Sequence, residues 1–188
     1  MKKIITISGP GGSGKSTIAK AIKEKLNAER IYVGGIRREY AKKLGMTLNE
    51  LNSYAINHPE SDVEIDKEAS KQARELAKTN LVIVEGRTQF HFLPESFKVY
   101  IKCDLDIAVK RIWSDLQVSN NRNEGDYKTP EELKQGIIDR ENSDLERYKK
   151  YYNINHKDEK QYDYVLDTSN LTQEKAIDNV LEVIKKNL

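Results

Sequence analysis

The stretch Gly9–Ser16, which reads GPGGSGKS, constrains the fold of this chain more than any other. It follows the β-branched run IITIS (residues 4–8), which is typical of a buried strand. It precedes residues 16–26, in which apolar side chains recur at helical spacing. The stretch fits the pattern G-x-x-x-x-G-K-[ST] at every fixed position, in the expected strand–loop–helix context. We therefore expect a strand, a glycine-rich phosphate-binding loop and a helix in succession.

Each part of this loop has a chemical reason. Glycines let the backbone curl so that successive N–H groups point inward, and the start of the following helix adds positive potential. Lys15 would supply a mobile charge for the β and γ oxygens of a triphosphate, and Ser16 a hydroxyl for Mg²⁺. The predicted ATP-binding residues of this stretch are Gly9, Gly11, Gly12, Ser13, Gly14, Lys15, Ser16 and Thr17. The motif predicts the donor and leaves the acceptor open.

The rest of the chain alternates short apolar runs with helical patterns. Further strands are expected at 30–35 (RIYVGG), 81–86, 98–103 and 162–168, and helices at 37–44, from 47, 61–77, 104–116, about 129–152 and 172–186. The polar stretch 117–130 is expected to be a loop. Strands that alternate with helices favour an α/β fold with a parallel sheet covered on both faces.

Composition excludes several classes of protein. Lysine plus arginine number 32 against 30 aspartates plus glutamates in 188 residues, so there is no basic excess typical of a nucleic-acid binder. Cys103 is the single cysteine, which rules out an internal disulfide and fits a cytosolic setting. No apolar run is long enough for a signal peptide or a membrane span. We expect a single-domain, monomeric cytoplasmic protein with no nucleic-acid polymer or membrane as a partner.

A carboxylate at the end of a neighbouring strand usually holds the water shell of the metal in such proteins. Glu85, which ends the run LVIVE, is the first candidate, and Asp104 after VYIKC is its rival. We favour Glu85, because Gly86 and Arg87 follow it and bring a cation to the same place. The alternative is that Glu85 caps a helix or pairs with a lysine.

Phosphoryl transfer depends on positioning and on positive charge around the transferred group. Arg38 and Arg87 lie next to the carboxyl ends of predicted strands, where open α/β sheets bind ligands. Arg140 and Arg147 would share a helix face, and Asp144 between them could hold their geometry. Arg37, Arg74 and Arg122 are expected to be solvated surface charges.

With these residues in view, the chain resembles the archaeal-type cytidylate kinases, a group of nucleoside monophosphate kinases. The opening of that family, ISGPPGSGKTT, matches ISGPGGSGKST, and its LEGR matches the stretch VEGR that contains Glu85 and Arg87. Its REESEAKRYKEYYGI matches RENSDLERYKKYYNI, residues 140–154, and its closing NTS matches DTS at 167–169. Its GDIFRELAKERGMSLEE has a counterpart from Gly34 onward.

The resemblance implies a P-loop NTPase fold of three layers, α/β/α, with a five-stranded parallel sheet in one domain over residues 1–188. It implies monophosphate-binding helices at about 35–78 and a lid at about 115–140. The implied catalytic residues are Lys15, Arg87, Arg111, Arg140 and Arg147. Thr168 and Ser169 would lie by the adenine, Arg38, Asp66, Arg87 and Arg140 would bind the acceptor, and Ser16 and Glu85 would serve Mg²⁺.

Some positions depart from the family pattern. Where the family has GDIFR, this chain has GGIRR, so Gly35 replaces an acidic residue. Aligned from Asp66, the family's DREIDRRQ becomes DKEASKQA, with Ser70 and Ala73 as the altered positions. The phosphate-handling positions are better kept than those expected to contact the base or the sugar.

The sequence thus favours an ATP- and Mg²⁺-dependent kinase that phosphorylates a nucleoside monophosphate, CMP or dCMP first. A second hypothesis is a P-loop kinase with another small acceptor, in which Asp66 would be the base for a hydroxyl. A third is a nucleotide-binding module without turnover.

Overall fold

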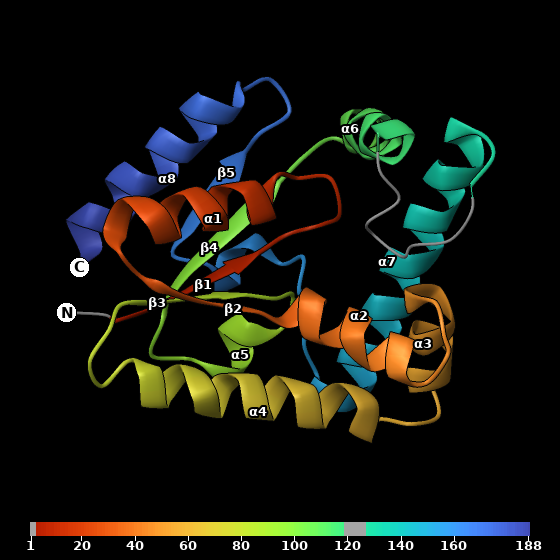
Figure 1. The fold of residues 1–188 in the computed structure, drawn as a ribbon, viewed down its shortest axis with the longest axis horizontal. Helices are drawn as coiled ribbons and strands as arrows, with labels where there is room; N and C mark the ends of the chain where they lie inside the picture. Colours follow the sequence, from red (N-terminus) through yellow and green to blue (C-terminus); the bar gives the residue numbers. More distant parts are fainter. Residues whose placement is uncertain (1–2, 119–126) are drawn as a thin grey trace.

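The computed structural model describes residues 3–118 and 127–188, which form a five-stranded parallel sheet with the strand order β2-β3-β1-β4-β5 (Figure 1). The strands are β1 (Ile4–Ser8), β2 (Glu29–Tyr32), β3 (Val82–Glu85), β4 (Phe97–Lys102) and β5 (Tyr164–Asp167). All five residues of β1 and all four of β3 are buried, as a sheet covered on both faces requires. The predicted three-layer α/β/α fold is confirmed.

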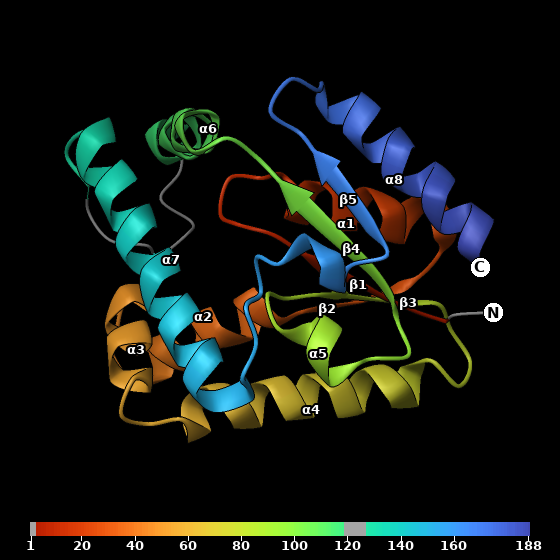
Figure 2. The same ribbon diagram turned by 180° about the vertical axis from the view of Figure 1, so that it is seen from behind.

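Helices surround the sheet. They are α1 (Lys15–Leu26), α2 (Val33–Lys43), α3 (Leu48–Ala55), α4 (Glu60–Leu76), α5 (Gln89–Phe92), α6 (Leu105–Val118), α7 (Pro130–Tyr152) and α8 (Gln173–Asn187), with a 3₁₀ turn at Glu159–Gln161. Helices α1 and α8 bury their apolar sides against one face of the sheet. Helix α4 covers β2 and β3 on the other face, and α5 and the end of α7 cover β4 there (Figure 2).

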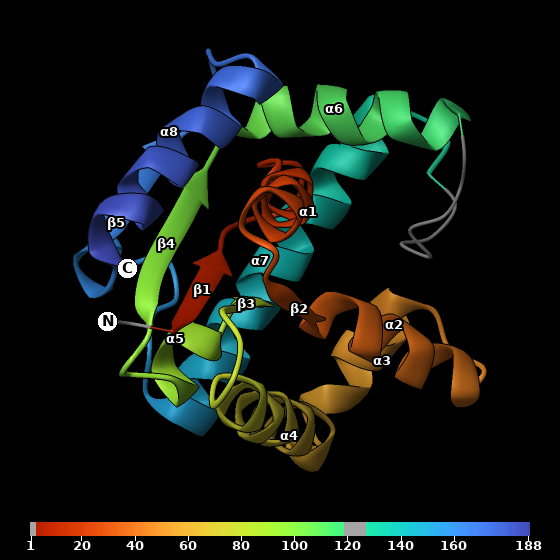
Figure 3. The same ribbon diagram turned by 60° about the vertical axis from the view of Figure 1, so that its left-hand side comes forward.

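The strands direct their carboxyl ends toward the functional part of the molecule. Figure 3 shows the arrowheads of β1 and β4 pointing to the end of the sheet at which α6 begins. Helices α2, α3, α6 and α7 lie together on one side of the sheet in Figure 1. Ligands of open α/β sheets bind at this end.

Two helix starts follow from their capping residues. Thr47 and Glu50 form the capping box predicted for α3, in which each side chain accepts from the other residue's backbone N–H. Thr129 caps α7 by accepting from the N–H of Glu132, and Pro130 occupies the first turn, as expected. Both signals are local, so the sequence alone could place them.

The second strand ends earlier than the sequence suggested. We expected RIYVGG to be extended through Gly35, but β2 stops at Tyr32 and α2 begins at Val33. A Cβ atom at Gly34 or Gly35 would lie 2.9 or 2.6 Å from the ring of Tyr32. The two glycines therefore make room for this ring in the first turn of a helix and do not end a strand. The short helix α5 and the 3₁₀ turn were also missed.

The predicted lid, about residues 115–140, includes residues 119–126, which lie outside the described residues. Its described parts are the end of α6 and the start of α7. The assignment of residues 35–78 to acceptor binding remains a prediction. Among the residues that the structure describes, none of the helices has the length and apolarity that crossing a bilayer would need.

Candidate functional site

The phosphate loop has the backbone that its glycines were expected to permit. Gly9 has φ +147° and Gly12 has φ +77°, values that L side chains rarely adopt. A Cβ at Gly9 would lie 2.1 Å from the carbonyl oxygen of Ile101, and one at Gly12 would lie 2.8 Å from Ala108. These two glycines thus serve both the curl of the loop and its close approach to β4 and α6.

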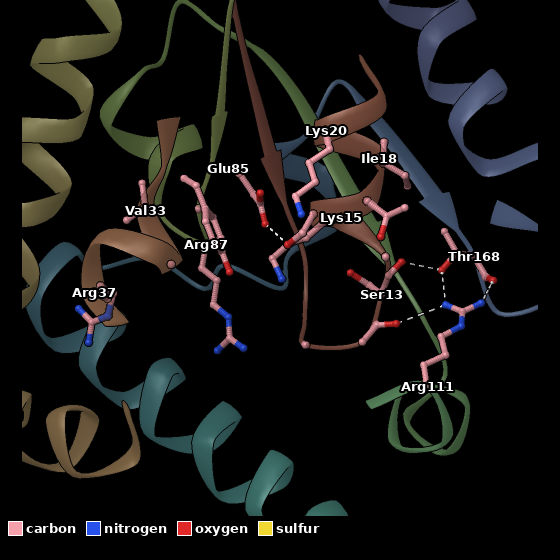
Figure 4. A pocket seen from close by; sticks show the side chains of 18 of the residues that line it. Ser13, Lys15, Ile18, Lys20, Val33, Arg37, Glu85, Arg87, Arg111 and Thr168 are labelled. Atoms are coloured by element: carbon pink, nitrogen blue, oxygen red, sulfur yellow. Dashed lines mark hydrogen bonds between the residues drawn. The ribbon is translucent and has the colours of Figure 1, made fainter. Parts of the chain in front are cut away.

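One large cavity, of about 590 Å³, lies over this loop (Figure 4). The predicted site residues that line it are Gly11, Gly12, Ser13, Gly14, Lys15, Ser16, Thr17, Arg38, Asp66, Glu85, Arg87, Arg111, Arg140 and Thr168. Gly9, Arg147 and Ser169 do not line it. The structure therefore brings together residues from six different elements that the sequence had assigned to one site.

The donor side of the cavity joins Ser16 to Glu85. The Ser16 hydroxyl donates to one carboxylate oxygen of Glu85, and Arg30 donates to the other. Glu85 is fully buried. Asp104 instead caps α6, because its Oδ1 accepts from the N–H of Asp106 at 2.8 Å. The geometry favours Glu85 over Asp104 as the carboxylate of the site.

The oxygens of Ser16 and Glu85 fit Mg²⁺ as a partial set of ligands. Mg²⁺ keeps several waters and takes one or two protein oxygens together with the phosphates of the substrate. The described residues contain no group of three or more His, Cys, Asp or Glu side chains that could form a complete protein cage for a metal. A hydroxyl and a carboxylate in contact at the loop are the donor set that a metal–triphosphate complex would use.

Arg30 was not singled out from the sequence. It lies on β2, two residues before Tyr32, and its guanidinium reaches across to β3 to pair with Glu85. Its side chain is 12% exposed and lines the cavity. A charged residue inside a buried-strand pattern was the available signal, since burial of an arginine requires a partner.

Arg111 and Thr168 link the phosphate loop to α6 and to the end of β5 through hydrogen bonds. Arg111 donates to the hydroxyl of Thr168 at 3.1 Å, to its carbonyl oxygen at 2.7 Å and to the carbonyl oxygen of Gly12 at 3.3 Å (Figure 4). The Thr168 hydroxyl donates to the carbonyl oxygen of Ser13 at 2.9 Å. Ser169 instead donates to Asp167 and accepts from the N–H of Asp104, outside the cavity.

The acceptor side of the cavity is rich in arginine. Arg38 donates to the hydroxyl of Tyr32 at 2.6 Å and to the carbonyl oxygen of Gly34 at 3.1 Å. Arg87 follows β3 and forms an ion pair with Asp144 of α7. Arg140 lines the cavity from α7. Three arginines from separate parts of the chain, Arg38, Arg87 and Arg140, thus line the same cavity.

The expectation for Arg37 was wrong. We expected a solvated surface charge, but its side chain is 13% exposed, pairs with Asp62 and donates to the Asn52 side chain at 3.0 Å. The cause is tertiary, because α4 brings a buried carboxylate to the start of α2. Arg74 does pair at the surface with Glu95 at 2.7 Å, as expected. Arg122 lies outside the described residues.

Arg147 lies behind the cavity wall. Its side chain is fully buried and forms ion pairs with Asp62 and Asp144. Asp144 does form an ion pair with an arginine of α7, as its position suggested, and that arginine is Arg147. Its second partner is Arg87, which lies after β3. The phosphate contact expected of Arg147 remains a prediction, and in the structure its guanidinium is held by two carboxylates.

Asp66 is buried in a network of donors. It accepts from Thr88 at 2.8 Å, from Gln89 at 3.0 Å and from Tyr152 at 3.0 Å. Burial raises the pKa of the Asp66 carboxyl above its usual range, although the three hydrogen bonds and the charge of Arg37 act in the opposite direction.

Two aspartates of α4 lie one turn apart and are both buried, Asp62 and Asp66. Ala73 of the same helix packs in the core and, like Ser70, does not line the cavity.

Comparison with known proteins shows a family relationship. The model of the cytidylate kinase-like family matches residues 4–170. The chain belongs to this family. A protein of Methanocaldococcus jannaschii named cytidylate kinase is 40% identical over 171 residues, covering 88% of each chain. One of Sulfolobus acidocaldarius with the same name is 37% identical and covers 98% of this chain and 96% of its own.

Another relative carries a different name. A protein of Lacinutrix mariniflava named S-adenosylmethionine-dependent nucleotide dehydratase is 35% identical over 187 residues. The match covers 99% of this chain but only 37% of that protein, so this chain spans about a third of its length. The family membership rests on the shared kinase-like region and does not by itself identify the acceptor.

Solved structures support the fold. A shikimate kinase from Acinetobacter baumannii has a TM-score of 0.59 at 17% identity and covers 100% of this chain and 95% of its own. An uncharacterized protein from Eubacterium ventriosum has a TM-score of 0.67 at 19% identity, covering 97% and 98%. The family and the phosphate loop together make this chain a P-loop kinase that binds nucleotides.

Proposed function

We propose that this chain transfers the γ-phosphoryl group of ATP to a nucleoside monophosphate, with CMP or dCMP as the acceptor. The observation that carries the proposal is that the phosphate loop shares one cavity with Arg38, Arg87 and Arg140. A phosphate-bearing acceptor needs this second set of cations, separate from those on the donor. The several relatives named cytidylate kinase support cytosine as the base.

In this proposal the two sides of the cavity hold the two substrates. The loop N–H groups and Lys15 would hold the triphosphate, with Arg111 keeping the loop attached to Thr168. Arg38 and Arg87 would hold the acceptor phosphate. An oxygen of that phosphate would attack the γ-phosphorus in line, while the bond from the γ-phosphorus to the bridging oxygen breaks and ADP leaves.

No general base is required for this step, because a phosphate monoester is largely ionised at neutral pH. The residues therefore contribute position and positive charge, which is how most phosphoryl transfer is accelerated. Mg²⁺, held next to Ser16 and Glu85, would neutralise charge on the transferring phosphates. Closure of the lid over the substrates would exclude water as a competing acceptor.

A hydroxyl acceptor is the second candidate, and Asp66 is the residue that would serve as its base. The environment of Asp66 weighs against this role, since three donors already occupy its oxygens. A substrate hydroxyl would have to share these two oxygens with the three donors.

An acceptor panel tests the proposal. ADP release would be followed in a coupled assay with ATP, Mg²⁺ and each of CMP, dCMP, UMP, AMP and a nucleoside. We expect CMP or dCMP to give the highest kcat/KM. Background rates with all monophosphates, alongside turnover of a nucleoside, would overturn the proposal in favour of a hydroxyl acceptor. ATP binding without turnover on any acceptor would support the module without catalysis.

A further inference from the structure

Tyr32 is a residue of the cavity with no role in the function proposed above. It is the last residue of β2, it is half-buried, and it lines the cavity. In the parallel register of the sheet it lies beside Glu85 on β3. It therefore lies next to the carboxylate of the donor side, at the point where β2 leads into α2.

The ring of Tyr32 covers the first turn of α2. A Cβ at Gly35 would lie 2.6 Å from the ring, and one at Gly34 would lie 2.9 Å from it. Real Cβ atoms essentially never approach this closely, so any side chain at Gly35 would force the ring to move. In this chain the ring takes the space beside a residue without a side chain.

The hydroxyl of Tyr32 holds Arg38. The guanidinium donates to it at 2.6 Å, and the same nitrogen donates to the carbonyl oxygen of Gly34 at 3.1 Å. The Arg38 guanidinium also lies 5.9 Å from the centre of the ring. A long side chain that is fixed at its charged end loses less freedom when a phosphate arrives.

A second arginine contacts the same ring. Arg30 lies 4.8 Å from the ring centre, in the range of a cation–π interaction, while it pairs with Glu85. Tyr32 thus has an arginine from the donor side and an arginine from the acceptor side on one aromatic ring. This arrangement is more specific than ordinary packing of a tyrosine at a strand end.

We propose that Tyr32 is a positioning residue that fixes Arg38 for the phosphate of the acceptor, and that Gly35 is required for its ring to do so. The inference rests on the proposed function, because Arg38 is the residue assigned there to the acceptor phosphate. Tyr32 acts through Arg38 and needs no contact with the reacting atoms.

A merely structural role makes a different prediction. If Tyr32 only packs against α2, its substitution lowers stability and reduces activity without selecting one substrate. A positioning role instead raises the acceptor KM and leaves the ATP KM unchanged, because only the geometry of Arg38 is lost. The change in the acceptor KM relative to the change in the ATP KM therefore distinguishes a positioning role from a structural role.

The first experiment compares Tyr32→Phe with Tyr40→Phe in the full chain. Tyr40 lies on the exposed side of α2 and provides the same loss of a hydroxyl outside the cavity. We expect Tyr32→Phe to raise the acceptor KM about tenfold, with the ATP KM changed by less than about twofold. Tyr40→Phe should resemble the wild type. An unchanged acceptor KM in Tyr32→Phe would overturn the inference.

The second experiment tests the coupling to Gly35. Gly35→Ala should raise the acceptor KM in the wild-type background by displacing the ring. In the Tyr32→Ala background the same change should have little further effect, because the ring is gone and the arginine is already released. Equal, additive effects in both backgrounds would show that Gly35 and Tyr32 act independently and would contradict the proposal.

Failure of the proposed function gives a different result from failure of this inference. Kinetic ratios are taken against the wild type with the acceptor that the panel identifies. A wild type that turns over no monophosphate removes the proposed function, and the inference with it. A wild type active on a monophosphate, together with a Tyr32→Phe variant of equal acceptor KM, removes the inference alone.

Discussion

Asp62 and Arg147 form an ion pair in which both side chains are only 1% exposed. The pair joins α4 to α7, and it continues on both sides. Asp62 also holds Arg37 of α2, and Arg147 also holds Asp144, which pairs with Arg87 after β3. This chain of charges links the proposed acceptor helices to the end of the central sheet without passing through the phosphate loop.

Breaking this pair should destabilise the fold. Arg147→Leu leaves two buried carboxylates without one of their partners, and loss of one member of a buried pair costs about 3–5 kcal/mol of unfolding free energy. We expect a loss near the lower figure, because Arg37 and Arg87 remain with Asp62 and Asp144. Urea unfolding followed by circular dichroism measures the difference.

The matched control is Arg74→Leu on α4. Arg74 pairs with Glu95 at the surface, where both side chains are nearly half exposed. Exposed pairs contribute about 1 kcal/mol or less, so this variant should unfold close to the wild type. Equal losses in the two variants would contradict the role assigned to the buried pair.

The phosphate loop and its carboxylate were predictable because their signals are local. Eight residues in a row specify the loop, and Glu85 directly ends an apolar strand. The positions of Arg30 and Arg37 depend instead on which strand or helix lies next to theirs. The carboxylates near them in sequence, Glu29 and Glu39, are not their partners. Arg30 pairs with Glu85 and Arg37 with Asp62, which are 55 and 25 residues away.

The start of α2 was missed for a related reason. Two consecutive glycines after an apolar run are typical of a strand end, and the sequence pattern contained nothing against that interpretation. The ring of Tyr32 reverses it, because its packing requires glycine within a helical turn. The typical preference of a glycine pair was overridden by a specific contact with a side chain only two and three residues away.

Lys15 should be indispensable for turnover. Its ammonium donates to the carbonyl oxygen of Pro10 at 3.2 Å, inside the loop that would surround the phosphates. Lys15→Ala should lower kcat by about 10²–10³-fold or more, because a charge directed at the transferring group is lost. Lys25→Ala, at the exposed end of α1, is the control and should retain wild-type kcat. Near-normal kcat in Lys15→Ala would contradict the assignment of the loop.

The metal requirement should depend on Glu85 and not on Asp104. Glu85→Gln keeps the size of the side chain but removes the charge beside Ser16, so we expect the Mg²⁺ concentration for half-maximal rate to rise by about tenfold. Asp104→Asn should leave this concentration unchanged, because Asp104 caps α6. Magnesium titrations at saturating ATP measure both. A larger shift in Asp104→Asn would reverse the assignment.

His156 should make the fold sensitive to acid. It is buried beside Tyr148, with ring centres 5.1 Å apart, and burial together with the nearby charges of Arg87 and Lys157 lowers the pKa of its imidazole to about 3. In the unfolded chain the pKa is near the ordinary value of about 6.5. Above that pH the ring is neutral in both states and contributes nothing to the pH dependence. Below it only the unfolded chain takes up the proton, so stability falls as the pH falls from about 6.5 toward 3.

The size of this effect can be isolated with a variant that does not titrate. Between pH 7.5 and pH 5 the wild type should lose about 2 kcal/mol of unfolding free energy through this group alone. His156→Gln should lose less by about that amount over the same interval, whatever its stability at pH 7.5. His58→Gln is the control, because His58 lies at the surface with 44% of its side chain exposed, and it should keep the wild-type slope. Urea unfolding at pH 7.5, 6 and 5 gives the three slopes. Parallel slopes for His156→Gln and the wild type would show that the buried imidazole is not the acid-sensitive group.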